Sequence, residues 1–379
     1  MNPSNPTNPN IESLAFNDFP LWKNNGSRPL FAIDLEITAR CNNNCRHCYI
    51  NLPQNDQDAL NAELSLEQIE KIAADALSLG TLWILITGGE PLIRKDFEDI
   101  YLFLKKKGFL VSVFTNATRI SERHIRLFRD YPPRDLEVTV YGITEDVYEN
   151  VTQVKGSFRQ FQRGLNLLLD NKIKTNLKTT ATQANKHQLI DITKFCREKG
   201  SAAFRFDPHL HLRFDGNEKR NTDIIAQRLT PEDIVELERK DPARMAALEK
   251  ECTCHDSDSM EKNSHSIDRL FYCGVGFNDC SISHNGLFRL CPSLWHPDFL
   301  YDLKAGTLKD AWEAFTPRVL SNHAHRGLTN RRCMACPLKD VCMWCPAHAF
   351  LETGDLNGEV AYFCEVAHKR SEKKVEMKT

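Results

Sequence analysis

Between residues 31 and 208 the sequence alternates short β-forming runs with amphipathic helical patterns, and this alternation restricts the fold more than any other feature. Strands are predicted at residues 31–38, 83–87, 111–115, 136–142, 174–180 and 203–208. Helices are predicted between them, at residues 65–80, 97–108, 121–131, 157–171 and 187–200. Strands that alternate with helices in this way pair in parallel through right-handed crossovers, so the sequence predicts an α/β fold.

Six strand–helix units are too few for a closed barrel of eight units, which needs about 250 residues. They fit a partial, open (β/α)6 barrel, whose active site is expected at the C-terminal ends of the strands. Unusual segments stand at four of those ends, at residues 41–48, 88–91, 115–116 and 141–142. We therefore expect these segments to converge on one rim of the barrel.

Three cysteines follow the first predicted strand at the spacing C-x3-C-x2-C, as Cys41, Cys45 and Cys48. A disulfide needs two thiols, whereas a structural zinc site or an ordinary iron–sulfur cluster needs four ligands. Three thiols therefore leave one coordination position for a substrate or cofactor. The alternative is a zinc knuckle whose fourth ligand is His47 or a distant cysteine.

The chain has 14 cysteines, and eight of them lie between Cys273 and Cys364. The first ten residues, MNPSNPTNPN, do not form a signal peptide, so we expect a cytoplasmic protein whose thiols stay reduced. Clustered cysteines in a reducing compartment indicate metal binding rather than disulfides.

Composition argues against two classes of partner. The net charge is −2, so no overall positive field favours nucleic acid. No apolar run reaches the roughly 18 residues of a membrane span, so no membrane partner is expected. We expect a disordered tail at residues 1–29, the barrel at 30–208, a linker with connecting helices at 209–272, and a small cysteine-rich domain at 273–379.

These motifs resemble those of the radical S-adenosylmethionine (radical SAM) superfamily. The cysteine triad is followed by an aromatic residue, Tyr49, and the second predicted strand is followed by Gly88-Gly89-Glu90-Pro91, which is similar to that family's GGEP motif. The resemblance covers roughly residues 30–210. The C-terminal region resembles the SPASM extension of such enzymes, with Cys273, twelve residues, Gly286, four residues and Cys291 as its opening.

The resemblance implies that the cysteine triad holds three irons of a [4Fe–4S] cluster. The fourth iron would take the amino and carboxylate groups of S-adenosylmethionine, whose reductive cleavage gives a 5′-deoxyadenosyl radical. An electron donor such as a flavodoxin or ferredoxin is then expected as a partner. In this comparison the cofactor carries the difficult chemistry and the protein supplies position and exclusion of water.

The resemblance also assigns residues to S-adenosylmethionine. Gly88 and Gly89 would let the backbone approach the methionine part, and Glu90 with the backbone of the turn through Pro91 would receive its ammonium group. Tyr49 would lie near the adenine.

Three further residues are candidates by position. Thr139 stands where the family often has a serine that reaches the ribose, although a plain strand residue is the alternative. Lys155 and Lys178 would pair with the methionine carboxylate, although surface lysines are common.

Eight cysteines suffice for two further clusters. By the family's interleaved pattern, the first would be ligated by Cys273, Cys280, Cys291 and Cys345, and the second by Cys333, Cys336, Cys342 and Cys364. Some relatives leave the position of Cys280 open for substrate, and one cluster plus a zinc ion is the alternative. Cys252 and Cys254 are interpreted as solvent-facing rather than as a further metal pair, and Cys196 as a core thiol.

Relatives with two auxiliary clusters mostly modify peptides or proteins, so the resemblance implies oxidative peptide modification or crosslinking. Sulfatase maturases carry an Asp directly after the cysteine that matches Cys291, whereas this chain has Pro292, which argues against that activity. About 30 residues precede the first strand, too few for the usual leader-binding domain, so leader recognition would need a separate leader-binding protein or another surface of this chain. Tetrapyrrole or other small-molecule chemistry is the alternative, and a non-catalytic electron-transfer protein is a third hypothesis.

The segment that follows the last predicted strand is expected to overhang the cavity. Its candidates for substrate contact are Arg205, Asp207, His209 and His211. The alternative is that these side chains belong to a solvated loop.

Overall fold

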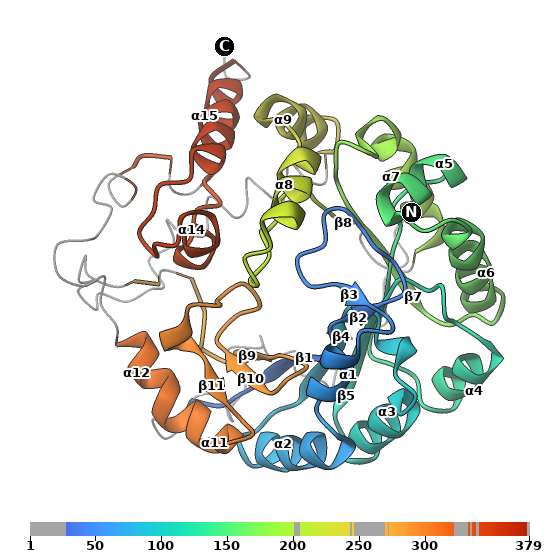
Figure 1. The fold of residues 1–379 in the computed structure, drawn as a ribbon. Helices are drawn as coiled ribbons and strands as arrows, with labels where there is room; N and C mark the ends of the chain where they lie inside the picture. The colour runs from blue at the N-terminus through green and yellow to red at the C-terminus, as the bar shows by residue number, and fades with distance from the viewer. Residues whose placement is uncertain are drawn as a thin grey trace, which may run out of the picture.

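The computed structural model describes residues 28–200, 205–242, 245, 270–271, 273–321, 333, 336–338 and 341–376. A curved sheet of nine strands lies at its centre, in the order β11-β10-β9-β1-β4-β5-β6-β7-β8 (Figure 1). A separate pair of two-residue strands, β2 (Arg40–Cys41) and β3 (Leu52–Pro53), lies beside the first of the parallel strands.

Six parallel strands form the barrel, which confirms the predicted α/β class and the six strand–helix units. Their bounds are β1 (Ala32–Thr38), β4 (Trp83–Gly88), β5 (Leu110–Thr115), β6 (Leu136–Thr139), β7 (Thr175–Thr180) and β8 (Arg205–Asp207). The helices that return between them are α2 (Leu66–Ser78), α3 (Phe97–Lys106), α4 (Glu122–Asp130), α6 (Ser157–Asp170) and α7 (Leu189–Lys199). In Figure 1 these helices form an outer layer around the sheet.

Local sequence explains why these helices begin and pack as they do. Ser65 caps α2 through a reciprocal capping box with Gln68. The buried face of α2 then packs on the sheet through Ile69, Ile72, Ala73 and Ala76. Helix α6 approaches the end of β5 so closely that a Cβ at Gly164 would lie 1.9 Å from the Ala117 carbonyl oxygen. Only glycine fits at that contact.

Several short elements were not predicted. They are α1 (Gln57–Ala62), α5 (Glu145–Thr152), and the 3₁₀ turns η3 (Pro91–Ile93) and η4 (Lys186–Gln188). Helix α5 matters for the site because its last turn faces the segment that carries the cysteine triad. The strand predicted at residues 136–142 ends at Thr139, before the turn that carries Tyr141.

The cysteine-rich region continues the barrel sheet. Strand β9 (Asp279–Ile282) pairs in parallel with β1, with Ile33 opposite Cys280. Strands β10 (Leu287–Arg289) and β11 (Tyr301–Asp302) extend the sheet in antiparallel fashion. Phe288 and Leu290 belong to the same buried core as the barrel strands. The boundary expected at residue 273 is therefore crossed by strand pairing and by a shared core.

The remaining C-terminal elements are helical. They are the 3₁₀ turn η5 (Pro297–Phe299), a continuous helical stretch of α11 (Leu308–Asp310), η6 (Ala311–Phe315) and α12 (Thr316–Leu320), and the two last helices α14 (Pro346–Thr353) and α15 (Ala361–Glu376). Trp312, in the middle of that stretch, is 1% exposed and anchors it on the core.

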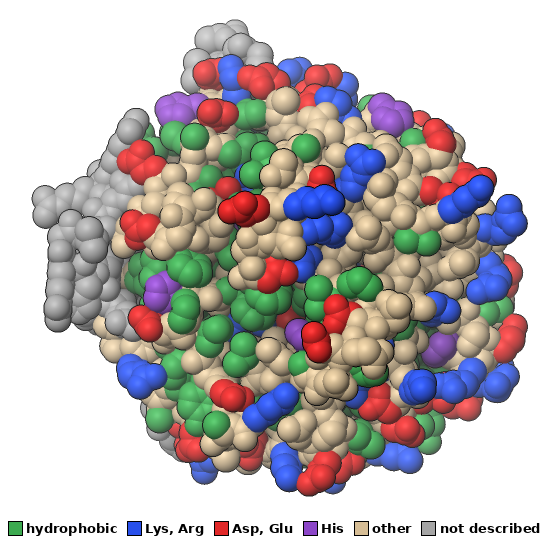
Figure 2. Space-filling model, viewed as in Figure 1, with side chains coloured by type: hydrophobic (Ala, Val, Ile, Leu, Met, Phe, Trp, Pro, Cys, Tyr) green, Lys and Arg blue, Asp and Glu red, His purple; other side chains and the backbone are tan. Residues whose placement is uncertain are grey.

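Residues 209–242 lie within the segment expected to hold a linker and connecting helices. They contain α8 (Glu218–Gln227) and α9 (Pro231–Arg239), which lie between the barrel and α15 (Figure 1). Arg370 on α15 donates to both carboxylate oxygens of Glu238 on α9, at 3.0 and 2.7 Å. Within the described ranges no helix is both long and apolar enough to cross a membrane. Figure 2 shows acidic and basic side chains interspersed over one face, without a large field of either sign.

Candidate active site

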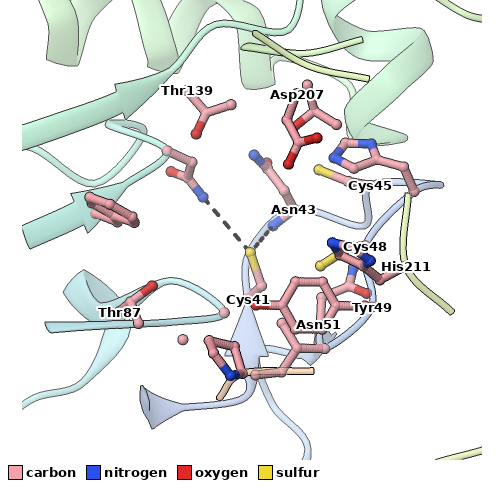
Figure 3. Close-up of a pocket in the computed structure, with 18 of the residues that line it drawn as sticks. Cys41, Asn43, Cys45, Cys48, Tyr49, Asn51, Thr87, Thr139, Asp207 and His211 are labelled. Atoms are coloured by element: carbon pink, nitrogen blue, oxygen red, sulfur yellow. Dashed lines mark hydrogen bonds between the residues drawn. The ribbon is translucent and has the colours of Figure 1, made fainter. Parts of the chain in front are cut away.

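A cavity of about 310 Å³ lies at the C-terminal ends of the barrel strands. This size is at the lower end of the range for small-molecule sites. Its wall is built by β1, by the segment that carries the cysteine triad, and by residues at the ends of β4 to β8 (Figure 3). The segments predicted to converge on one rim all contribute side chains or backbone to it, as Cys41, Gly88, Thr115 and Tyr141.

The three thiols of the triad lie close enough to act on one another. Burial raises the pKa of Cys41 well above its ordinary value, and the neighbouring Cys45 and Cys48 raise it further. Burial raises the pKa of Cys45 to about 12, although the Tyr141 hydroxyl donates to its sulfur. Two donors reach the Cys41 sulfur, the Asn43 backbone N–H at 3.4 Å and the Asn116 amide at 3.8 Å (Figure 3). Bound iron would supply the positive charge that this group of thiols lacks.

The triad segment is held in place from two sides. On one side, the backbone N–H of Asn44 donates a hydrogen bond at 2.9 Å to the backbone oxygen of Thr152, in the last turn of α5. On the other side Arg220, on α8, donates to the Cys45 carbonyl at 3.0 Å and to the Asn51 side chain at 2.7 Å. Sequence analysis missed this second support, because the arginine is about 170 residues away in a charged segment interpreted as a linker with connecting helices.

A second arginine makes the same connection. Arg213 is 3% exposed and donates to the Asn51 carbonyl at 3.1 Å. It also pairs with Asp215, at 2.6 Å. The segment that follows β8 is thus tied to the residues immediately after the cysteine triad.

The glycine turn after β4 has a packing role in addition to the contact expected with the cofactor. A Cβ at Gly88 would lie 2.1 Å from the Thr38 carbonyl oxygen, and one at Gly89 would lie 2.3 Å from the Arg40 carbonyl oxygen. Gly88 also has a φ of +135°. Glycine is therefore required here because the turn packs on the backbone between β1 and the cysteine triad. Both glycines line the cavity as well, so their contact with S-adenosylmethionine stays a prediction.

Glu90 is fully buried and its carboxylate is occupied by protein donors. It accepts from the Thr115 hydroxyl at 2.7 Å, the Asn116 N–H at 2.7 Å and the Leu92 N–H at 3.1 Å. Burial raises its pKa to about 7. The carboxylate thereby orients Asn116, whose amide donates to Cys41. Neither Glu90 nor Pro91 is among the residues that line the cavity. The expected ammonium contact of Glu90 stays a prediction, and its observed partners are within the protein.

Of the other candidates for cofactor contact, Tyr49, Thr139 and Lys178 line the cavity. Burial and the charge of Glu36 raise the pKa of the Tyr49 hydroxyl. Lys178 forms an ion pair with Glu137 and lies 3.5 Å above the centre of the Phe114 ring. Lys155 is exposed and is not among the cavity-lining residues.

The end of β8 and the segment that follows it contribute three of the four candidates for substrate contact. Asp207, His209 and His211 line the cavity, whereas the side chain of Arg205 is outside the described part of the chain. His211 lies 6.5 Å from Tyr49 and stacks on His348 of α14 at 4.2 Å, measured between ring centres. Burial lowers the pKa of His211 to about 4, so its imidazole is neutral at neutral pH.

Two acidic side chains on β1 also line the cavity, and sequence analysis missed them. Asp34 and Glu36 alternate with apolar residues in the run IDLEI, a pattern that identifies an inward polar face of a strand. Burial, Asp279 and Glu36 raise the pKa of Asp34 to about 6. Arg289 on β10 donates to Glu36 at 2.9 Å.

The structure gathers the remaining predicted cysteine ligands into two groups. In the first group, Cys273 raises the pKa of Cys291, and Cys273 and Cys291 together raise the pKa of Cys345, beyond the effect of burial. In the second group, burial, Glu359 and the other three cysteines of the predicted set raise the pKa of Cys333. Those three are Cys336, Cys342 and Cys364.

Cys280 is buried on β9 and lines a neighbouring cavity together with Cys273 and Cys291. Cys252 and Cys254 lie outside the described residues. Cys196 is 1% exposed in the core, as expected. His47 lies against Tyr141, at 5.2 Å between ring centres. Within the described ranges no group of three His, Cys, Asp or Glu side chains is arranged to hold a single metal ion.

The residues present fit an iron–sulfur cluster with S-adenosylmethionine. Three mutually close thiols border a cavity whose lining supplies an aromatic ring, hydroxyl groups and glycine backbone, from Tyr49, Thr139, Gly88 and Gly89. Such a donor set suits a cofactor that has an adenine, a ribose and a charged amino-acid part.

Comparison with known proteins also indicates the radical SAM superfamily. Residues 35–196 match the family model of the radical SAM superfamily. The chain is 25% identical over 345 residues to the antilisterial bacteriocin subtilosin biosynthesis protein AlbA of Bacillus subtilis, covering 88% of this chain and 69% of that protein. It is 23% identical over 360 residues to an AdoMet-dependent heme synthase of Nitratidesulfovibrio vulgaris, covering 89% of this chain and 92% of that protein.

The fold is shared with a solved structure. SuiB of Streptococcus suis, bound to its precursor peptide SuiA, superposes with a TM-score of 0.64 at 15% identity. The match covers 88% of this chain and 75% of that one, so it includes the C-terminal extension. At this identity the likeness concerns the fold.

Proposed function

The chain is a radical SAM enzyme, and from this premise we propose that it modifies a peptide or protein side chain by oxidation or crosslinking. Cys41, Cys45 and Cys48 would hold the [4Fe–4S] cluster that binds S-adenosylmethionine. When bound, these groups supply the removal of a hydrogen atom from a carbon that is otherwise unreactive. The protein's own residues orient the substrate and exclude water from the cavity.

The charge of the cavity wall is the observation that favours a peptide substrate over a tetrapyrrole. Among the described residues that line it, Asp34, Glu36 and Asp207 are acidic, whereas Lys178 is basic and is already paired with Glu137. A tetrapyrrole of the haem pathway carries several carboxylates, and like charges that face each other in a partly dry cavity are unfavourable. A neutral or basic peptide side chain fits this wall better.

The relatives support both classes of substrate. AlbA is named for the biosynthesis of the bacteriocin subtilosin, and SuiB is solved with a precursor peptide. The AdoMet-dependent heme synthases favour a second candidate, a tetrapyrrole, because they match over most of the chain. The acidic wall is the observation that ranks the peptide first.

The two groups of cysteines after residue 272 support two auxiliary clusters. The first would be held by Cys273, Cys280, Cys291 and Cys345, and the second by Cys333, Cys336, Cys342 and Cys364. An oxidised product forms when the peptide loses one hydrogen atom and then one proton and one electron. A nearby cluster is a suitable acceptor for that electron.

The reaction needs partners that supply an electron and a substrate. A flavodoxin or ferredoxin in the cytoplasm would provide the electron for S-adenosylmethionine cleavage. A separate leader-binding protein would present the precursor peptide. His209 and His211 would contact the substrate, because both line the same cavity as the cysteine triad.

The test is co-expression of the chain with each short peptide encoded beside its gene, followed by mass spectrometry. The expected result is a mass decrease corresponding to two hydrogen atoms in one peptide, absent with the Cys45→Ala variant. A tetrapyrrole or another metabolite consumed in place of every such peptide would contradict the proposal.

A further inference from the structure

Two carboxylates in the cavity have no role in holding the cluster. Asp34 and Glu36 lie two residues apart on β1, so both side chains point to the same face of the sheet. That face is the inner wall of the cavity. Leu35 between them is 2% exposed and belongs to the core on the other face.

Glu36 has an oxygen without a donor. The side chain is 3% exposed, and Arg289 donates to Oε1 at 2.9 Å. Oε2 is buried, and among the described residues nothing donates to it. A buried carboxylate oxygen without a partner is unfavourable, so this atom points to a donor that is absent from the free chain.

Asp34 occupies the boundary between two cavities. It lines the cavity beside the cysteine triad and also a neighbouring cavity of about 420 Å³ that is lined by Cys273 and Cys291. Pro292 is the other residue common to both linings. A group bound at Asp34 would therefore lie between the cluster that binds S-adenosylmethionine and the first auxiliary group of cysteines.

The local cations offset the negative charge of this wall only in part, because Arg289 and Lys178 lower the pKa of Asp34 whereas burial, Asp279 and Glu36 raise it by more. Arg289 is fixed against the Trp295 ring, 3.8 Å from its centre, and gives one hydrogen bond to Glu36. Lys178 is engaged by Glu137. Asp279 adds a third negative charge, because it and Glu36 both act on Asp34.

We propose that Asp34 and Glu36 form a subsite for one cationic side chain of the substrate peptide, an amine or a guanidinium. The proposal rests on the peptide function inferred above and specifies the substrate further. The cation would donate to Glu36 Oε2 and to Asp34, and it would offset the charge excess of the wall. A cation bound there would place the carbon atoms of the same side chain within the cavity, beside the cysteine triad.

The experiment measures binding to the reconstituted holoenzyme with S-adenosylmethionine present and no reductant. The probes are three fluorescein-labelled pentapeptides that differ only at the central residue, which is lysine, norleucine or glutamate. Norleucine keeps the length of the lysine side chain without its charge. Fluorescence anisotropy gives each dissociation constant. We expect the lysine peptide to bind at least about tenfold more tightly than the norleucine peptide, because only lysine can form a hydrogen-bonded ion pair with the carboxylates in this partly dry cavity.

Three variants test which residues cause the discrimination. Asp34→Asn and Glu36→Gln should each reduce the preference for lysine to within about threefold, since each removes one of two charges. Asp34 is half-buried and forms no ion pair with a residue that the structure describes, so its variant remains informative if Glu36→Gln destabilises the fold. Asp298→Asn is the control, because that carboxylate is 83% exposed and lies outside the cavity. Circular dichroism and iron content verify that each variant is folded and loaded.

The possible failures are distinct. Equal binding of the lysine and norleucine peptides to the wild type overturns the subsite and leaves the peptide function standing. No binding of any peptide contradicts both. S-adenosylmethionine affinity, measured by equilibrium dialysis, separates a further possibility: if Asp34→Asn weakens the cofactor and leaves peptide discrimination intact, the carboxylates serve the cofactor and the subsite is wrong.

Discussion

Arg220 should control how firmly the cysteine triad holds iron. It makes three hydrogen bonds to the triad segment, to the Asn44 side chain at 3.0 Å, the Cys45 carbonyl at 3.0 Å and the Asn51 side chain at 2.7 Å. Arg220→Ala removes all three, whereas Arg213 still connects the same regions through Asn51. We therefore expect a folded protein with a looser triad segment.

The size of the effect follows from the number and exposure of these bonds. Hydrogen bonds from a charged donor contribute about 1.5–3 kcal/mol each when buried, and Arg220 is only partly buried, so we take about 1 kcal/mol each. The sum of about 3 kcal/mol corresponds to roughly a hundredfold change in a local opening equilibrium. Water replaces part of the lost contact, so an increase of about tenfold in opening is the expected lower limit.

The assay is the rate at which a ferrous chelator removes iron from anaerobically reconstituted protein. Arg220→Ala should release the iron of one cluster about tenfold faster, and Arg220→Lys should lie between it and the wild type because lysine keeps the charge without the planar fork. Arg163→Ala is the control, since that side chain is exposed on α6. If Arg220→Ala releases iron within about twofold of the wild-type rate, the arginine does not stabilise the triad segment and the reasoning is refuted.

Three other outcomes are expected. The reconstituted wild type should hold about twelve irons, and Cys45→Ala should lose about four of them and form no 5′-deoxyadenosine; a full iron content in that variant would contradict the assignment of the triad. Gly89→Ala should lower the melting temperature and weaken S-adenosylmethionine binding, because its Cβ would meet the Arg40 carbonyl at 2.3 Å, whereas Gly274→Ala, whose Cβ meets no atom within 4 Å, should do neither. Replacement of Cys333 and Cys336 together by serine should expose only the chain after residue 321 to protease, because β9 to β11 belong to the barrel sheet; cleavage within that sheet would argue against this shared core.

The parallel barrel was predictable because its signals are local. The parallel strands β1, β4, β5, β6 and β7 are short runs rich in β-branched or apolar residues, and each returning helix shows its own amphipathic pattern and, for α2, its own cap at Ser65. The cysteine triad and the glycine turn were recognisable for the same reason, since each occupies a few consecutive residues.

The missed features all depend on contacts between distant residues. Arg220 contacts Asn51 across 169 positions, and Arg289 contacts Glu36 across 253. A charged segment with weak periodicity gives no sign of which carbonyl or carboxylate its arginines will meet. The pairing of β9 with β1 was missed because a four-residue strand inside a turn-rich region has too little pattern to indicate its neighbour.

The chain that follows β8 both lines the cavity and supports the segment that carries the cysteine triad. The chain after β8 carries His209 and His211 on the cavity wall, and a few residues later it carries Arg213 and Arg220, which grip the backbone near the cysteines. A substrate that moves this chain must shift those arginines or stretch their hydrogen bonds. If substrate binds at these histidines, substrate occupancy and cluster environment would be linked by the same contacts, and the effect of substrate on the cluster would equal the effect of the cluster on substrate affinity. The physical link is a set of charge-assisted hydrogen bonds between one segment and one loop, and the Arg220 variants described above would weaken it in both directions.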